Sequence, residues 1–149
     1  MRVLSNRGVM VMKINYGKAV VGGLVGTVVL TVVGLYAAPM MGIPQMNPAA
    51  MLAGKMGGNM AAGWVAHFMV GVVLALIYAA VASRLPGAPW LRGAIYGIAP
   101  WLVFEIVMLP MMGMPLFSGS MMSAMGALIG HLLYGATVGA IYGPVPTGA

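Results

Sequence analysis

The sequence predicts an all-α integral membrane protein, a four-helix bundle made of two tandem, parallel helical hairpins. Three observations predict it. Of the 149 residues, 62% are hydrophobic and only 5% are charged, whereas soluble domains carry about 25% charged residues. Four separate segments are apolar over about the 20 residues that a spanning helix needs. Finally, the hexapeptide "PMMGIP" at 39–44 returns as "PMMGMP" at 110–115, which indicates an internal duplication.

We expect the four spans at about 18–38, 60–82, 93–109 and 121–143, within a single transmembrane domain covering 1–149. Proline-containing segments follow each of the first three spans. Proline has no backbone N–H and a fixed φ, so it is expected to end the helices there. In the first outer loop, Asn47-Pro48 and Asn59 are good helix-starting residues. They predict a short helix over Ala49 to Met56, lying flat on the outer leaflet, before the second span.

The cations predict the orientation of the chain. Six of them fall on one side of a four-span arrangement, and only Lys55 falls on the other. The six are Arg2, Arg7, Lys13, Lys18, Arg84 and Arg92. By the positive-inside rule, both termini and the turn at 83–92 are cytoplasmic, in a bacterial inner membrane. A cleaved signal peptide is the alternative for the N-terminus, but its apolar run is longer than an ordinary signal-peptide core.

Aromatic residues near the same level predict a membrane-interface belt. They are Tyr16, Tyr78, Trp90, Tyr96 and Tyr142.

An offset of 71 aligns the two hexapeptides and the first and third spans, and an offset of 64 aligns His67 with His131 in the second and fourth. The repeats would cover about 18–82 and 93–145. Each would contain two spans, so both would insert in the same direction. This would be a parallel repeat, related by an axis along the membrane normal, and not the inverted repeat of many transporters.

Small residues recur on the predicted helix faces, where they would let backbones approach closely in lipid. The candidate packing glycines are Gly22, Gly26, Gly93, Gly97, Gly130, Gly135 and Gly139.

The "PMMG" turns and the histidine-bearing second helix of each half resemble uncharacterised bacterial four-span membrane proteins of no assigned function. The resemblance covers the whole chain. It implies no mechanism.

His67, Glu105 and His131 fall well inside the predicted spans, where polar side chains are costly and are candidate functional residues. Three interpretations stay open. The first is a structural network in which the histidines donate to a backbone carbonyl or to Glu105 and fix the helix register. The second is a cofactor site in which His67 and His131 bind haem b or join Glu105 around a metal ion. The third is a proton or quinone path.

Methionine gathers at the predicted outer face, and soft thioethers favour Cu(I). The outer methionines are Met40, Met41, Met46, Met51, Met56, Met60, Met111, Met112, Met114, Met121, Met122 and Met125. Adaptable apolar packing is the other explanation. No histidine lies in either outer loop, which favours packing over copper.

Three negative features restrict the function. The chain has no cysteine and therefore no thiolate site. Its cations are scattered, so a nucleic-acid face is not expected. It has no phosphate-binding loop or hydrolase motif, so we expect no catalytic activity of its own.

We therefore expect a small accessory subunit that packs, in the lipid bilayer, against itself or against other subunits of a respiratory or photosynthetic complex. Haem b or copper binding through the paired histidines, and a role as a small transporter or in a proton or quinone pathway, are the alternatives.

Overall fold

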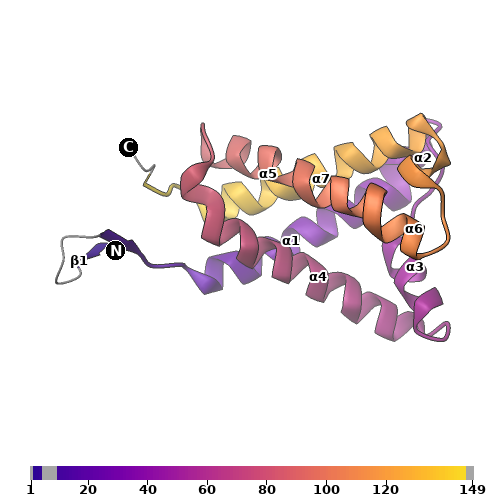
Figure 1. Cartoon of the computed structure of the whole chain (residues 1–149), viewed down its shortest axis with the longest axis horizontal. Helices are drawn as coiled ribbons and strands as arrows, with labels where there is room; N and C mark the ends of the chain where they lie inside the picture. Colours follow the sequence, from indigo (N-terminus) through magenta and orange to yellow (C-terminus); the bar gives the residue numbers. More distant parts are fainter. Residues whose placement is uncertain (1, 5–9, 147–149) are drawn as a thin grey trace.

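The computed structural model describes residues 2–4 and 10–146. Four helical spans form an elongated bundle, with both termini at one end (Figure 1). The spans are Tyr16–Met40, Met60–Arg84, Pro89–Met111 and Met121–Tyr142, each long and apolar enough to cross a membrane. The predicted all-α, four-span fold of a multi-pass membrane protein is therefore confirmed. Ahead of the bundle, the short strands β1 (Arg2–Leu4) and β2 (Met10–Met12) pair antiparallel.

Each of the first and third spans contains a π-helical segment close to the end away from the chain termini. The first consists of α1 (Tyr16–Val32), η1 (Val33–Ala37) and α2 (Ala38–Met40). The third consists of α5 (Pro89–Val103), η3 (Phe104–Met108) and α6 (Leu109–Met111). The two π segments are 71 residues apart, the offset that aligns the hexapeptides. The spacing supports the duplication, and the equivalence of the two halves in space stays a prediction.

Proline does not end these spans where we expected. Pro39 and Pro110 lie inside α2 and α6, immediately after the π segments. In an α-helix, a proline ring clashes with the carbonyl four residues earlier, and proline has no N–H to donate to that carbonyl. A π turn, which is wider, precedes each of these prolines, so the helix continues past it. Two carbonyl oxygens of the π segment before Pro39 accept hydrogen bonds from the following loop. Gly34 O accepts from Met46 N at 3.1 Å, and Leu35 O accepts from Gln45 Nε2 at 2.9 Å.

The remaining elements are α3 (Pro48–Lys55), α4 (Met60–Val81), the 3₁₀ segments η2 (Ala82–Arg84) and η4 (Leu116–Gly119), and α7 (Met121–Tyr142). The side chains of Asn47 and Asn59 accept from Ala50 N and Ala62 N and so start α3 and α4, as predicted. α3 packs against α4 through the buried Ala49 and Ala53, which ties it to the bundle.

The long helices are arranged in the order α4, α1, α7, α5. α1 packs against both α4 and α7, and α5 packs against α7, whereas α4 has little contact with α5. Figure 1 shows α4 separating from the other helices toward the end that carries α3. The bundle is thus incompletely closed between α4 and α5.

At the end that carries the termini, three tyrosines form the core and do not make the predicted interface belt. Tyr78, Tyr96 and Tyr142 are buried, with ring centroids 5.4 and 5.8 Å apart in edge-on pairs. Tyr16 and Trp90 are exposed. Arg92 is also buried there. Its Nη1 donates to Val145 O at 3.1 Å, while its Nε has no partner among the described residues.

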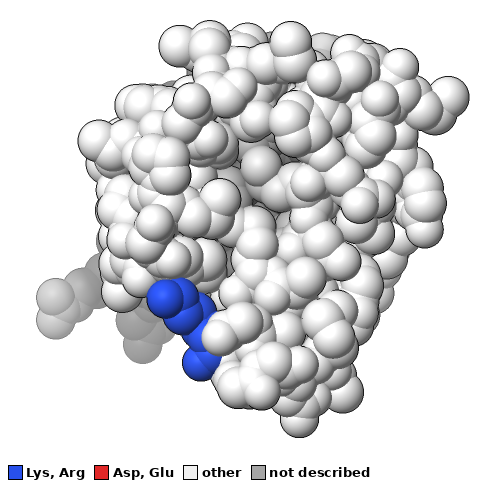
Figure 2. Space-filling model, turned by 90° about the vertical axis from the view of Figure 1, so that its right-hand side faces the viewer, with Lys and Arg blue, Asp and Glu red and all other residues white. Residues whose placement is uncertain are grey.

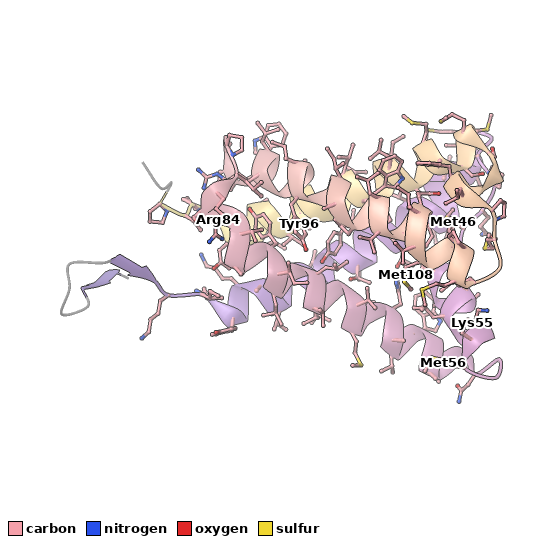
Figure 3. The ribbon with its side chains drawn as sticks, viewed as in Figure 1. Met46, Lys55, Met56, Arg84, Tyr96 and Met108 are labelled. Atoms are coloured by element: carbon pink, nitrogen blue, oxygen red, sulfur yellow. The ribbon has the colours of Figure 1, made fainter. Side chains whose placement is uncertain are left out.

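The opposite end is nearly uncharged. Figure 2 views the molecule from that end and shows a white surface with one blue area. Figure 3 labels Lys55 at this end and Arg84 at the end of the termini.

Candidate functional site

His67 and His131 line one cavity inside the bundle, here called the central cavity. Its volume is about 440 Å³, within the range of small-molecule pockets. α1, α4, α5 and α7 form its walls, and residues of η1, η3, α3 and the loop before α3 line it at the end away from the chain termini. Most of the lining is apolar. Its polar members are Thr27, His67, Tyr96, Ser123, His131 and Tyr134.

His67 on α4 is buried and bonded to α1. Its Nε2 lies 3.0 Å from Thr31 Oγ1, and that hydroxyl donates its only hydrogen to Thr27 O at 2.7 Å. Thr31 Oγ1 must then accept from Nε2–H. Neutral His67 therefore carries its proton on Nε2, and its Nδ1 keeps a lone pair.

His131 on α7 carries its proton on Nδ1, the other ring nitrogen from that of His67. Its Nδ1 lies 2.8 Å from Ala127 O, and a carbonyl can only accept. The ring is therefore protonated on Nδ1, and Nε2 keeps a lone pair. The Phe104 ring packs against it with centroids 5.7 Å apart.

Both rings line one apolar cavity, and each keeps one unprotonated nitrogen. Among residues 2–4 and 10–146, neither His67 Nδ1 nor His131 Nε2 has a hydrogen-bond partner, and neither is sealed by surrounding atoms. Each can accept a hydrogen bond or bind a metal ion.

Two tyrosine hydroxyls hold α4 to the rest of the bundle beside the cavity. Tyr134 on α7 donates to Gly71 O at 2.5 Å, and Tyr96 on α5 donates to Leu74 O at 2.8 Å. Figure 3 labels Tyr96 between the helices. Because α4 packs little against α5 and α7, these bonds carry much of the connection on that side.

Comparison with known proteins adds a family. Residues 14–147 match the family described as "Family of unknown function (DUF6789)", and this match covers the whole bundle. The chain belongs to the DUF6789 family. No curated protein and no solved structure matches it.

In this DUF6789 chain, Glu105 lies apart from the histidine arrangement that we expected. It is fully buried in η3, and both of its carboxyl oxygens lie within 3.2 Å of Ser118 Oγ. Phe117 and Ser118 have positive φ values of 52° and 57°, a region that non-glycine residues seldom adopt. The strained η4 segment therefore supplies the partner that we had assigned to a histidine.

The three-residue metal site is likewise not assembled. Within the described part of the chain, no three His, Asp or Glu side chains lie close enough together to hold a metal ion. What the structure brings together is the pair His67 and His131, with four thioethers, those of Met46, Met51, Met108 and Met112, lining the same cavity.

Four of the predicted packing glycines meet where α5 crosses α7. A Cβ built at Gly93 would overlap Gly135 O, and one at Gly135 would overlap Gly93 O. Gly97 faces His131 O, and Gly139 faces Pro89 O.

The other three predicted glycines lie along α1 and α7. Gly22 and Gly26 on α1 approach Val138 and Tyr134 of α7, whereas Gly130 has space for a methyl group.

Sequence reasoning missed the residues that partner the predicted ones. Thr31, Ser118 and Tyr134 were not singled out. A signal for the first exists in the sequence, because Thr27 and Thr31 are four residues apart in an otherwise apolar span and share a helix face. Ser118 carries no comparable signal, since its placement depends on the η4 backbone.

Proposed function

We propose that this DUF6789 protein binds a lipophilic small molecule inside the membrane. The observation that carries the proposal is the central cavity, which joins an apolar lining to two unsatisfied imidazole nitrogens. The small contact between α4 and α5 supports entry of the ligand from the surrounding lipid. Lipid tails match the lining, and the two nitrogens fix the position of a polar group.

Native mass spectrometry of protein extracted from its own membrane tests this. We expect an organic adduct of fixed mass on the wild type, and its loss in Ala99→Trp, which fills the cavity from α5. Ala80→Trp is the matched control, since Ala80 lies on α4 outside the cavity lining. A wild type without an adduct, or an adduct that Ala99→Trp retains, would reject the proposal.

Haem b or copper binding is a second candidate, favoured by the two ring lone pairs and, for copper, by the four cavity methionines. An absorption spectrum and metal analysis of the purified protein test it. A Soret band lost in His67→Phe would support haem. Protein without iron or copper would exclude both.

Packing within a larger membrane complex and the cytoplasmic position of both termini stay predictions.

The chain has no cysteine, so its orientation in the membrane can be tested with single-cysteine variants. We expect an impermeant thiol reagent, applied from outside the inner membrane, to label Gly54→Cys on α3 but not Ser83→Cys in η2. The reverse result would invert the orientation.

A further inference from the structure

We infer that the ligand of the central cavity is a hydroquinone, a flat aromatic ring with two hydroxyl groups and an apolar tail. This rests on the proposed function and names the chemical class of its ligand. The inference begins from the protonation of the two histidines, which their hydrogen-bond partners assign.

Both free nitrogens are acceptors. Thr31 Oγ1 accepts the hydrogen bond that His67 Nε2–H donates, and Ala127 O accepts the one that His131 Nδ1–H donates. The imidazole atoms left for a ligand are therefore His67 Nδ1 and His131 Nε2, which can accept hydrogen bonds but donate none. A ligand with carbonyl oxygens alone would place lone pairs against lone pairs. A ligand with hydroxyl groups would satisfy both.

The two acceptors stand on different helices, α4 and α7. A single alcohol group can donate its one hydrogen to only one ring. Two hydroxyls on a rigid frame can donate to both, which places one donor toward each helix. The two para-hydroxyls of a hydroquinone are such a pair of donors on a rigid ring.

The lining decides the rest of the ligand. Of the four other polar side chains of the cavity, three are engaged within the protein, and the Ser123 hydroxyl has no hydrogen-bond partner among the described residues. Tyr96 and Tyr134 donate to carbonyls of α4, and Thr27 donates to Gly23 O. A sugar or phosphate headgroup would lose its hydration here without compensation. An aromatic ring with an isoprenoid-like tail would instead contact Leu30, Val70, Val103 and Phe104.

Calorimetric titration of the purified protein in nanodiscs tests this. The probes are a short-tailed hydroquinone, kept reduced with ascorbate, its dimethyl ether and the corresponding quinone. All three share one ring and tail, and only the first donates hydrogen bonds. We expect the hydroquinone to bind about 30-fold more tightly than the ether, the effect of two net hydrogen bonds. The quinone should bind as weakly as the ether.

Ring-preserving variants locate the effect. His67→Phe and His131→Phe should each weaken hydroquinone binding about 5-fold, the effect of one net hydrogen bond. Neither should weaken binding of the ether. Met69→Leu is the control, because Met69 lies two residues from His67 on α4 and is exposed. A variant that does not fold leaves the wild-type comparison of the three probes intact.

The outcomes separate the two levels of the proposal. Equal binding of hydroquinone and ether would overturn the inference and leave a lipophilic ligand in place. No binding of any probe, together with no native adduct, would overturn both. One equivalent of iron or copper in the purified protein would also overturn the inference, because the ring nitrogens would then be metal ligands.

Discussion

The hydroxyl oxygen of Thr31 lies 3.0 Å from Nε2 of His67, and this contact joins α1 to α4 and leaves the other ring nitrogen free. The Thr31 hydroxyl donates its own hydrogen bond to Thr27 O. His67, Thr31 and Thr27 O therefore form a chain of hydrogen bonds that all run in one direction. Such chains strengthen each bond in a low-dielectric interior. Thr31 is therefore a positioning residue for His67.

Replacing Thr31 by valine should weaken hydroquinone binding about 5-fold, because His67 loses the partner that holds its proton on Nε2. Thr31→Ser keeps the hydroxyl and should restore the affinity. Thr137→Val, which removes an exposed hydroxyl bonded to Leu133 O, is the control. Binding by Thr31→Ser that is as weak as that of Thr31→Val would show that the methyl group, not the hydroxyl, matters.

The double variant Tyr96→Phe/Tyr134→Phe should loosen α4. Each hydroxyl contributes about 1 kcal/mol, so the free energy of unfolding in detergent should fall by about 2 kcal/mol. Spin labels on Val73→Cys and Ile98→Cys, on α4 and α5, should show a broader distance distribution by pulsed EPR. Tyr36→Phe, at an exposed tyrosine, should change neither quantity. A distribution as narrow as that of the wild type would mean that packing alone holds α4.

Gly135→Ala should disrupt the crossing of α5 and α7. Its methyl group would overlap Gly93 O, and overpacking of this kind costs about 1–3 kcal/mol. Gly130→Ala on the same helix is the matched control, since its Cβ would lie 3.7 Å from Leu30 Cγ, an ordinary contact. Thermal unfolding followed by circular dichroism compares them. Equal stability of the two variants would show that the helices can move apart without cost.

Ser118→Ala should lower the free energy of unfolding by about 1–3 kcal/mol, because it leaves the buried Glu105 carboxyl without a partner. Glu105→Gln keeps a side-chain oxygen for Ser118 Oγ and should cost less. Ser83→Ala, at the other end of the bundle, should be neutral. If Glu105→Gln proved more damaging than Ser118→Ala, the carboxyl group would have a role beyond this hydrogen bond.

The sequence predicted the number of spans well because hydropathy and length are local properties, and lipid requires them of each helix separately. It placed the third span late. The helix starts at Pro89, not near 93, because proline suits the first helical position. Pro39 and Pro110 were predicted to end the first and third spans, and this was wrong, because a π segment before each proline lets the helix continue.

The candidate site was only partly readable. His67 and His131 were found because imidazoles in apolar spans stand out. That they line one cavity could not be predicted, because the cavity depends on the separation of α4 and α5, and side-chain packing sets that separation. The pairing of Glu105 with Ser118, and the burial of Tyr78, Tyr96 and Tyr142 in the core, depend on tertiary contacts that no sequence period encodes.

The most direct test of the central claim uses the fact that the chain has only two histidines. Two-bond ¹H–¹⁵N NMR of imidazole-labelled protein, at mildly alkaline pH, reports which ring nitrogen carries the proton. His67→Gln assigns the two spectra. We predict one ring protonated on Nε2 (His67) and one on Nδ1 (His131), with hydroquinone shifting the resonances of both unprotonated nitrogens. Two rings in the same tautomer, or spectra that hydroquinone leaves unchanged, would contradict the account.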